Sequence, residues 1–426
     1  MTKICVLGLG YIGLPTASIL ATHGFEVVGV DVDARVVQIV NNGGLPIEEP
    51  GLKTIVKAAI NSGNLRAALA PEPADAFIIA VPTPILNPGK EVDLSFIEAA
   101  TKSIVPVLAK ENLVVLESTS PPGTTKDFLV PLLEGSGLKA GEEFLVAYCP
   151  ERVLPGRILK ELIANSRIIG GINPASAEAA KKIYSRFVEG EICLTVSTTA
   201  EMVKLMENTY RDVNIALANE LAVICDRLRI SAWEVIKLAN LHPRVNLHLP
   251  GPGVGGHCLA VDPWFIVGKF PEEARIIALG RQINDAMPGY VIRSIFRIME
   301  QFEEPKVTVL GVSYKANIDD VRESPALEIL KQLEERKIRF SVYDPHVKDF
   351  SYELSSLSEA FRDSDLALII AGHEEFKFLH PQELGKLMRR RVVVDTRNCL
   401  DHGLWRAGGF AVYVLGAGDL AKDEVG

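Results

Sequence analysis

A glycine-rich turn near the start of the chain constrains the fold more than any other feature. The pattern Gly-x-Gly-x-x-Gly, formed by Gly8, Gly10 and Gly13, stands between a β-branched apolar run at 4–7 and a helical stretch at 14–23. In such a strand–turn–helix unit the first glycine makes the tight turn and the second admits a pyrophosphate against the backbone. The third lets helix and strand pack closely. The pattern therefore predicts a dinucleotide site at the N-terminus of the first helix.

An acidic residue ends the second expected strand, at 26–30. Asp31 lies 31 − 13 = 18 residues beyond Gly13. A carboxylate at this place accepts hydrogen bonds from the adenosine ribose and repels a 2′-phosphate, so NAD is the predicted cofactor. Nearby Arg35 leaves NADP open as an alternative. A purely structural glycine turn is the alternative to nucleotide binding.

Further short apolar runs alternate with helical stretches in the first third of the chain, at 76–81, 113–116 and 144–147. This alternation predicts a parallel, doubly wound sheet. From Thr198 or Thr199, either of which can cap a helix, apolar residues recur at helical spacing as far as Leu228. A helix of this length usually connects domains or packs against a partner subunit. A second helical stretch is expected at roughly 272–302.

A new α/β unit is expected after Glu303-Glu304-Pro305. Residues 306–344 repeat the strand–turn–helix–strand order of the N-terminus without its glycine triplet, and more strands are expected at 366–370 and 392–394. The predicted fold class is therefore α/β, in three parts. A Rossmann-type NAD-binding domain occupies 1–195, a central long-helix segment 196–302, and a Rossmann-like α/β domain 303–426.

Charge and cysteine content exclude several classes of protein. With 45 Lys+Arg against 54 Asp+Glu the net charge is −9, which disfavours a nucleic-acid binder. Six isolated cysteines without a CxxC pair indicate neither a disulfide scaffold nor a structural metal, and they fit the cytoplasm. The apolar stretch 4–21 suggests a signal peptide, but its glycines and Pro15 interrupt it. No other apolar run has the ~20 residues that cross a membrane.

One cysteine stands in a segment unlike the rest of the chain. Cys258 lies in Pro-Gly-Pro-Gly-Val-Gly-Gly-His-Cys-Leu-Ala-Val-Asp-Pro-Trp-Phe, residues 250–265. Glycines let a substrate approach the backbone and polar neighbours stabilise a thiolate, so Cys258 is the candidate nucleophile. The alternative is the usual role of cysteine, a small buried hydrophobe. That role is expected for Cys5, Cys193, Cys225 and Cys399.

Two polar groupings accompany the thiol. Lys204, Asn208 and Arg211 are spaced by four and three residues, so they share one face of the long helix. A solvated polar stripe is the alternative explanation. Glu151 belongs to Tyr-Cys-Pro-Glu-Arg-Val-Leu-Pro-Gly-Arg, residues 148–157, directly after an expected strand. Active sites of open parallel sheets lie at such carboxyl ends.

These motifs together resemble the UDP-glucose and GDP-mannose dehydrogenase family. The resemblance extends in order over nearly the whole chain, through GLGYIGLP, VPTP, STSPPGTT, PERVLPG, EMVKLMEN, GVGGHCLAVDP and YKANIDDVRESPA. It implies an N-terminal NAD domain, a helical dimerisation segment and a C-terminal UDP-binding domain. It also implies a homodimer or a larger homo-oligomer with shared active sites.

The resemblance also assigns roles to matching positions. It implies that Cys258 is the nucleophile and that Lys204 stabilises charge or transfers protons. Asn208 and Asp262 match supporting positions, and Glu151 fits a water-organising role. The positions matching cofactor contacts, beside the three glycines, are Tyr11, Ile12, Asp31, Arg35, Thr83, Thr119 and Arg322. Those matching UDP-sugar contacts are Arg152, Val153, Lys204, Asn208, Arg211, His242, Arg244, Gly255, Tyr314 and Lys315.

The implied reaction is the NAD-dependent, four-electron oxidation of the C6 hydroxyl of a UDP-sugar to a carboxylate, through a thiohemiacetal and a thioester on Cys258. Val261 stands where UDP-glucose enzymes typically have lysine. The resemblance therefore favours UDP-N-acetyl-D-mannosamine over UDP-glucose and leaves UDP-N-acetylglucosamine open. No metal, membrane or nucleic acid is expected to take part.

Two other functions compete with this one. A single-step β-hydroxyacid dehydrogenase shares the dinucleotide fold and a helical lysine, but it needs neither the thiol nor residues 306–426. A non-catalytic NAD or nucleotide-sugar sensor would keep the glycines without needing Cys258, Lys204 and Asp262 together. The number of NADH molecules formed per sugar distinguishes the three functions. The four-electron oxidation gives two, the single-step dehydrogenase gives one, and the sensor gives none.

Overall fold

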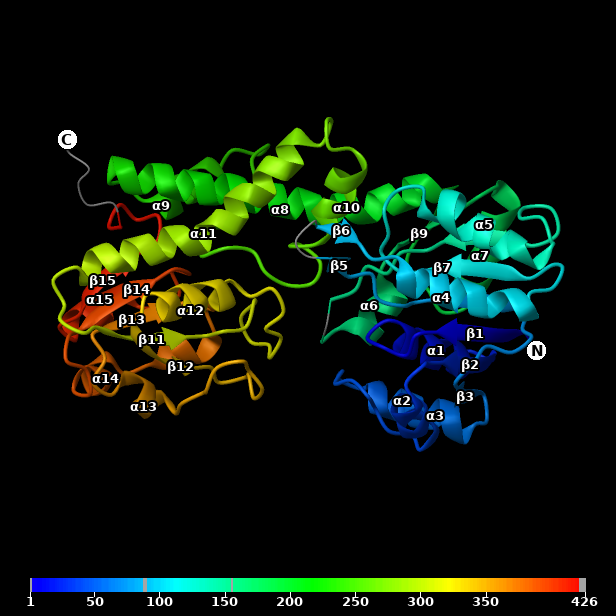
Figure 1. The fold of residues 1–426 in the computed structure, drawn as a ribbon, viewed down its shortest axis with the longest axis horizontal. Helices are drawn as coiled ribbons and strands as arrows, with labels where there is room; N and C mark the ends of the chain where they lie inside the picture. The colour runs from blue at the N-terminus through cyan, green and yellow to red at the C-terminus, as the bar shows by residue number, and fades with distance from the viewer. Residues whose placement is uncertain (1, 87–89, 155, 421–426) are drawn as a thin grey trace. The chain divides into compact units, whose positions relative to one another are not determined.

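The computed structural model describes residues 2–86, 90–154 and 156–420. The chain divides into two compact units, each built around its own sheet (Figure 1). The first unit comprises Met1–Glu207 and Trp264–Phe270, and the second comprises Asn208–Pro263 and Pro271–Gly426. Among the helices of the described ranges, none combines the length and the apolar character that crossing a bilayer requires.

The sheet of the first unit is doubly wound. Its strands are β1 (Lys3–Leu7), β2 (Glu26–Val30), β3 (Leu65–Ala68), β4 (Ala76–Ile79), β7 (Leu113–Leu116), β8 (Leu145–Tyr148), β9 (Arg167–Gly171) and β10 (Ile192–Val196). Their spatial order is β10-β9-β8-β7-β4-β1-β2-β3, and every pair is parallel except β8 with β9. The predicted parallel sheet is confirmed. Its strand order reverses direction between β1 and β4, and ligands bind at such a point in open α/β sheets.

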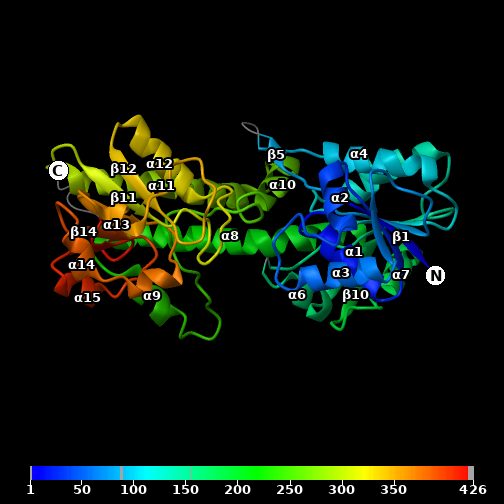
Figure 2. The same cartoon turned by 90° about the horizontal axis from the view of Figure 1, so that it is seen from below.

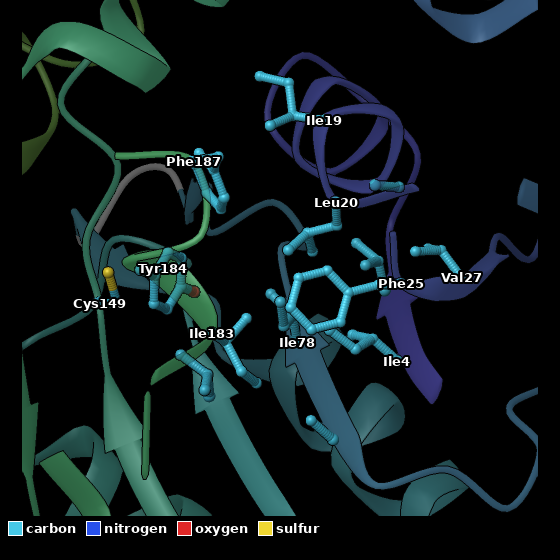
Figure 3. Close-up of a cluster of buried hydrophobic side chains, with 14 of the residues drawn as sticks. Ile4, Ile19, Leu20, Phe25, Val27, Ile78, Cys149, Ile183, Tyr184 and Phe187 are labelled. Atoms are coloured by element: carbon cyan, nitrogen blue, oxygen red, sulfur yellow. The ribbon is translucent and has the colours of Figure 1, made fainter. Parts of the chain in front are cut away.

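Helices cover both faces of this sheet. They are α1 (Gly13–Thr22), α2 (Ala34–Asn41), α3 (Leu52–Asn61), α4 (Ser95–Ile104), α5 (Val130–Leu133), α6 (Ile158–Ala164) and α7 (Pro174–Tyr184). Helices α1, α3, α6 and α7 pack on one face, and α4 and α5 on the other. Figure 3 shows the first of these cores, where Phe25 lies among Leu20 of α1, Ile4 of β1 and Ile78 of β4. A short hairpin of β5 (Ile85–Leu86) and β6 (Glu91–Val92) completes the strands of this unit.

The glycine turn joins β1 to α1 as its sequence predicts. Gly8 has φ +92°, a conformation that side chains disfavour. A Cβ on Gly13 would stand 1.8 Å from the Gly8 carbonyl oxygen, so helix and strand approach too closely for any side chain. A Cβ on Gly10 would meet nothing within 4 Å, which leaves its backbone open to a ligand.

Helix α8 (Ser197–Leu228) is one continuous helix and the longest of the described ranges (Figure 2). Its predicted end at Leu228 is confirmed. The predicted cap is wrong, because Thr198 and Thr199 already lie inside a helix that directly follows β10 at Val196. The burial of Cys193 was also expected and is wrong, since this thiol is exposed on β10, the edge strand of the sheet.

The buried side of α8 carries a row of polar residues, each paired within its own unit. Glu201 accepts hydrogen bonds from the backbone of Gly123 and Thr125 in the first unit. The other members, Asn208, Asp212, Asn219 and Asp226, are paired within the second unit. All five are at most 2% exposed. The face that α8 turns to the interior therefore combines paired polar groups with small and apolar residues such as Leu205, Ala218 and Ala222.

The second unit contains a five-stranded parallel sheet. Its strands are β11 (Lys306–Leu310), β12 (Arg339–Tyr343), β13 (Leu366–Ile369), β14 (Val392–Asp395) and β15 (Ala411–Val414), in the order β12-β11-β13-β14-β15. The predicted second α/β sheet is confirmed. The remaining helices are α9 (Ala232–Ala239), α10 (Asp262–Lys269), α11 (Arg275–Met299), α12 (Pro325–Glu335), α13 (Leu357–Phe361), α14 (Pro381–Gly385) and α15 (His402–Ala407). Helices α11 and α12 pack on one face of the sheet, and α13, α14 and α15 on the other (Figure 1).

The contact between Gly13 and Gly8 generates a test of this turn. Gly13→Ala forces a methyl group against a backbone carbonyl, so we expect the free energy of unfolding to fall by about 2 kcal/mol or more. Gly10→Ala adds the same methyl group where the structure has room and should change stability by less than about 1 kcal/mol. Urea denaturation of both variants measures the difference. Equal stabilities would contradict the packing described for Gly13.

Candidate active site

Asp31, at the end of β2, is tied to the glycine turn. Its carboxylate accepts the N–H of Leu9 at 3.0 Å and the N–H of Asp33 at 2.9 Å. These bonds fix the carboxylate beside the open backbone of Gly10. Arg35 pairs with Asp33 at 2.7 Å and is exposed, so this guanidinium has a carboxylate partner of its own.

Two more of the predicted cofactor residues meet at the carboxyl ends of neighbouring strands. Thr83 follows β4 and donates its hydroxyl hydrogen to the carbonyl of Thr119, which follows β7, at 2.7 Å. Tyr11 is 44% exposed and Ile12 is half-buried in the glycine turn. Arg322 belongs to the second unit, where its guanidinium pairs with Asp320.

Glu151 follows β8 and lies in a buried ionic cluster. It is 8% exposed and accepts a hydrogen bond from Arg167 of β9 at 2.8 Å. Its other oxygen accepts the N–H of Arg152 at 2.7 Å. The Arg152 side chain pairs with Glu207 of α8, while Val153 packs against the core beneath. Arg167 thus orients Glu151, and through it the backbone of the predicted substrate segment.

A second carboxyl of this cluster, Glu117, was not anticipated. It follows β7, is fully buried, and accepts the hydroxyl hydrogen of Tyr184 at 2.6 Å. Burial raises the pKa of Glu117 to about 7, although the positive charge of Arg167 opposes this shift. Arg167 lies over the Tyr184 ring, 5.1 Å from its centroid, and this ring is labelled in Figure 3. A lone glutamate directly after an apolar strand was the available signal for this site.

Cys258 lies partly exposed on the segment before α10, residues 250–261, which we call the thiol loop. Its carbonyl accepts the N–H of Asp262, the first residue of α10, at 2.8 Å. The Asp262 carboxylate accepts a hydrogen bond from the Asn208 amide, and Asn208 accepts one from Arg211. Three predicted residues of two distant segments are therefore joined in the second unit. Lys204 lies one helical turn before Asn208, on the same side of α8.

The predicted sugar-binding residues of the second unit fall in two places. Gly255 is packed so closely that a Cβ would stand 2.4 Å from the Glu323 carbonyl oxygen and 2.9 Å from the Tyr314 Cβ. Lys315 is exposed beside Tyr314. His242 and Arg244 occupy an exposed turn after α9 and contact one another, with the Arg244 N–H donating to His242.

One group in the described ranges has metal-ligating side chains close together, namely His346, His373 and Glu375. Both ring nitrogens of His373 are already occupied. Nδ1 accepts the N–H of Asn317 at 2.9 Å, and Nε2 bonds to Asp344 at 3.0 Å. Burial alone would raise the pKa of Asp344, but the hydrogen bonds from His373 and backbone N–H groups lower it to about 2. A metal ion bound here would have to displace these hydrogen bonds. The expectation from the sequence that no metal takes part stays a prediction.

Comparison with known proteins agrees with this geometry along the chain. Three models of the UDP-glucose/GDP-mannose dehydrogenase family match it: the NAD binding domain at residues 2–188, the central domain at 198–286 and the UDP binding domain at 308–402. The chain belongs to this family. Its glycine turn therefore lies in an NAD-binding domain, and β12, β13 and β14 of its second sheet lie in a UDP-binding domain.

Individual relatives match over nearly their full lengths. A UDP-N-acetyl-D-mannosamine dehydrogenase of Methanococcus maripaludis is 51% identical over 98% of this chain and 97% of its own. An NDP-N-acetyl-D-galactosaminuronic acid dehydrogenase of Ralstonia nicotianae is 48% identical over 95% of this chain and 96% of its own. The structure of UDP-D-ManNAc dehydrogenase from Pyrococcus horikoshii has a TM-score of 0.92 and 42% identity, and covers 98% of this chain and 100% of that one.

The raised pKa of Glu117 predicts a pH-dependent stability. The folded pKa is about 7, above the ordinary value of 4.5. This carboxyl therefore stabilises the fold fully below pH 4.5, and its contribution is lost as the pH rises through 7. Glu117→Gln mimics the protonated form at every pH. The measured quantity is the difference in unfolding free energy between the wild type and Glu117→Gln. We expect this difference to fall by about 2–3 kcal/mol between pH 5 and 8.

Urea denaturation across this pH range measures that difference. Glu178→Gln makes the same charge change on the exposed side of α7, and its difference from the wild type should stay constant within about 0.5 kcal/mol. A constant difference for Glu117→Gln as well would refute the protonation of Glu117 in the folded chain.

Proposed function

We propose that this chain oxidises the C6 hydroxyl of UDP-N-acetyl-D-mannosamine to a carboxylate, giving UDP-N-acetyl-D-mannosaminuronate and two NADH. The observation that carries the proposal is the thiol loop. A partly exposed cysteine on glycine-rich backbone, flanked by the paired Asn208 and Asp262, suits covalent capture of an aldehyde. A sensor or a single-step dehydrogenase has no use for this arrangement.

The residues of the glycine turn fit NAD. Gly10 leaves room for a pyrophosphate against the backbone. Asp31 is held at the end of β2, where its carboxylate oxygens can also accept hydrogen bonds from the ribose hydroxyls. Thr83 and Thr119, at the carboxyl ends of β4 and β7, complete the residues that we assign to the cofactor in the first unit. Bound NAD supplies the two-electron acceptor for each oxidation.

The chain's own residues then carry the substrate chemistry. Loss of hydride from C6 and of the hydroxyl proton gives the aldehyde. The Cys258 thiolate adds to its carbonyl carbon, and the thiohemiacetal oxygen takes up a proton. A second loss of hydride and proton gives the thioester. Attack by water releases the carboxylate and restores the thiol. Covalent capture keeps the aldehyde from leaving between the two oxidations.

Lys204 and Asn208 stabilise the oxyanions of these steps in this proposal, and a donor of this kind contributes about 3–4 kcal/mol. Asp262 holds the Asn208 amide in place. Glu151, oriented by Arg167, organises the attacking water. Arg152, Arg211 and Lys315 supply cations to the UDP-sugar.

The choice of sugar is supported by the named relatives and by Val261. The names of both relatives contain an N-acetylated sugar, which supports a substrate with an acetamido group. Arg211 offers hydrogen-bond donors to that group. A panel of UDP-sugars assayed for NADH tests the choice. Faster oxidation of UDP-glucose than of UDP-N-acetyl-D-mannosamine under matched conditions would overturn it. One NADH per sugar would replace the proposed reaction by a single-step oxidation.

The covalent role of Cys258 gives a direct prediction. Cys258→Ala should abolish steady-state turnover while NAD binding, measured by titration, stays within about threefold, because the glycine turn is untouched. Cys225→Ala removes a buried thiol of α8 that packs with Ala232 of α9, and should leave kcat within about threefold. Uronate formation by Cys258→Ala at a rate near that of the wild type would disprove the mechanism.

We also propose that the central segment pairs two copies of the chain. Helix α8 exposes an apolar row on its outer side, at intervals of four, seven, seven and four residues: Met206, Tyr210, Leu217, Ile224 and Leu228. Each of these side chains is at least 43% exposed. A second α8 is the occupant that this row fits, since the heptad spacing is that of paired helices. We propose the division into domains at 1–195, 196–302 and 303–426, because each of the three family models falls within one of these parts.

We propose that in such a dimer Arg244 reaches the active site of the partner subunit. Its position on an exposed turn, where its guanidinium contacts only the neighbouring His242 among the described side chains, supports this role. Mixing the inactive variants Cys258→Ala and Arg244→Ala under subunit exchange should then restore activity. A mixed dimer holds one site with both residues intact, giving up to about half of the wild-type rate. Proven heterodimers without activity would assign Arg244 to its own subunit's site or to neither.

A further inference from the structure

Four buried polar side chains lie beneath the thiol loop. Asp212 and Asn219 come from α8, and Arg281 and Asn284 from α11; all are at most 1% exposed. The Asn219 amide donates to the Asn284 side-chain oxygen at 2.8 Å, and the Asn284 amide donates to the Asp212 carboxylate at 2.8 Å. Arg281 pairs with the same carboxylate oxygen. We call these four residues the loop anchor.

The loop anchor holds the thiol loop at both ends. At its start, the Gly251 N–H donates to the Asn219 side-chain oxygen at 2.8 Å. At its other end, Arg281 lies 3.5 Å from the carbonyl oxygen of Leu259, the residue directly after Cys258. The chain of hydrogen bonds therefore runs beneath the loop from one side of the thiol to the other.

Stability alone does not account for this cluster. Burying a charge pair costs several kcal/mol per ion, and apolar residues of similar volume often serve as well or better. Two buried atoms of the anchor, Asp212 Oδ2 and Arg281 Nε, even lack hydrogen-bond partners among the described atoms. Burial accordingly raises the pKa of Asp212 despite its Arg281 partner. Such a cluster fixes geometry, because its hydrogen bonds are directional while apolar contacts are not.

We propose that the loop anchor positions the Cys258 thiol for its attack on the substrate carbon. This inference rests on the proposed nucleophilic role of Cys258. Asp212, Asn219, Arg281 and Asn284 are positioning residues, since they act on the reacting sulfur only through the loop backbone. A displacement of about 1 Å at a reacting group can cost ~100-fold in rate, so the anchor's effect should appear in kcat.

Arg281→Lys tests the proposal while keeping the charge. Arg281 Nη1 contacts both Asp212 and the Leu259 carbonyl, while Nη2 binds Asp285. Lysine carries a single nitrogen on a shorter side chain without this fork, so its ammonium does not keep all three contacts. We expect kcat to fall about 30- to 100-fold, with the KM values for NAD and the UDP-sugar within about threefold. Asp285→Asn is the matched control. It removes the other, exposed partner of Arg281 and should leave kcat within about twofold.

Alkylation by iodoacetamide gives a readout that a merely structural role would not produce. The exposed Cys193 serves as an internal reference, and the buried Cys5, Cys149 and Cys225 report unfolding. Mass spectrometry at a fixed alkaline pH should show Cys258 of Arg281→Lys alkylated at least about fivefold faster, relative to Cys193, because its loop is released. The buried thiols should stay unlabelled.

Each outcome decides the proposal. A kcat within threefold of the wild type, or an unchanged Cys258 alkylation ratio, would overturn it. If the buried thiols of Arg281→Lys are labelled, that variant is unfolding, and the isosteric variant Asp212→Asn is measured instead. If the buried thiols of Asp212→Asn are labelled as well, the cluster has a structural role and the loop anchor is refuted. Cys258→Ala is assayed alongside. An active Cys258→Ala refutes the nucleophile itself, whereas an inactive one with an unimpaired Arg281→Lys refutes only the loop anchor.

Discussion

The buried polar row of α8 is the interaction on which the rest of the structure depends. Glu201, at one end, binds the backbone that follows β7 in the first unit. Asp226, at the other, accepts the Tyr290 hydroxyl and the N–H groups of Gly416 and Gly418, just after β15 in the second. Buried polar groups stabilise a fold only when they are paired, so each pairing fixes where a neighbouring segment lies against the helix.

The same turn geometry occurs at the head of both sheets although their sequences differ. After β1, Gly8 turns the chain and Asp31 accepts the N–H of Leu9. After β11, Gly311 has φ +79° and Asp344 accepts the N–H of Val312 at 2.7 Å. A positive-φ residue followed by a carboxylate at the end of the adjacent strand therefore suffices for this turn. The first copy adds Gly10, which leaves its backbone open, and Gly13, which lets α1 approach the turn closely.

Sequence periodicity predicted α8 and most strands of the two sheets, because burial of alternating or helical patterns is a local property, but it missed β3, β9, β10 and β15. It could not predict which side of α8 is buried. Met206, Leu217 and Ile224 supported the helix, yet all three are exposed. Two partners of the polar row, Arg281 and Tyr290, lie more than 60 residues away along the chain. The resemblance singled out Glu151 but gave no signal for its partner Arg167, which is 16 residues distant and comes from another strand.

The carboxyl of Glu117 couples folding to the solution in a further way. With a folded pKa of about 7 and an ordinary value of 4.5, this group is half protonated in the folded chain at neutral pH and ionised in the unfolded one. Folding at pH 7 therefore draws about half a proton from the buffer at this one side chain. The heat of unfolding should accordingly depend on which buffer supplies that proton, since buffers differ in their enthalpies of ionisation.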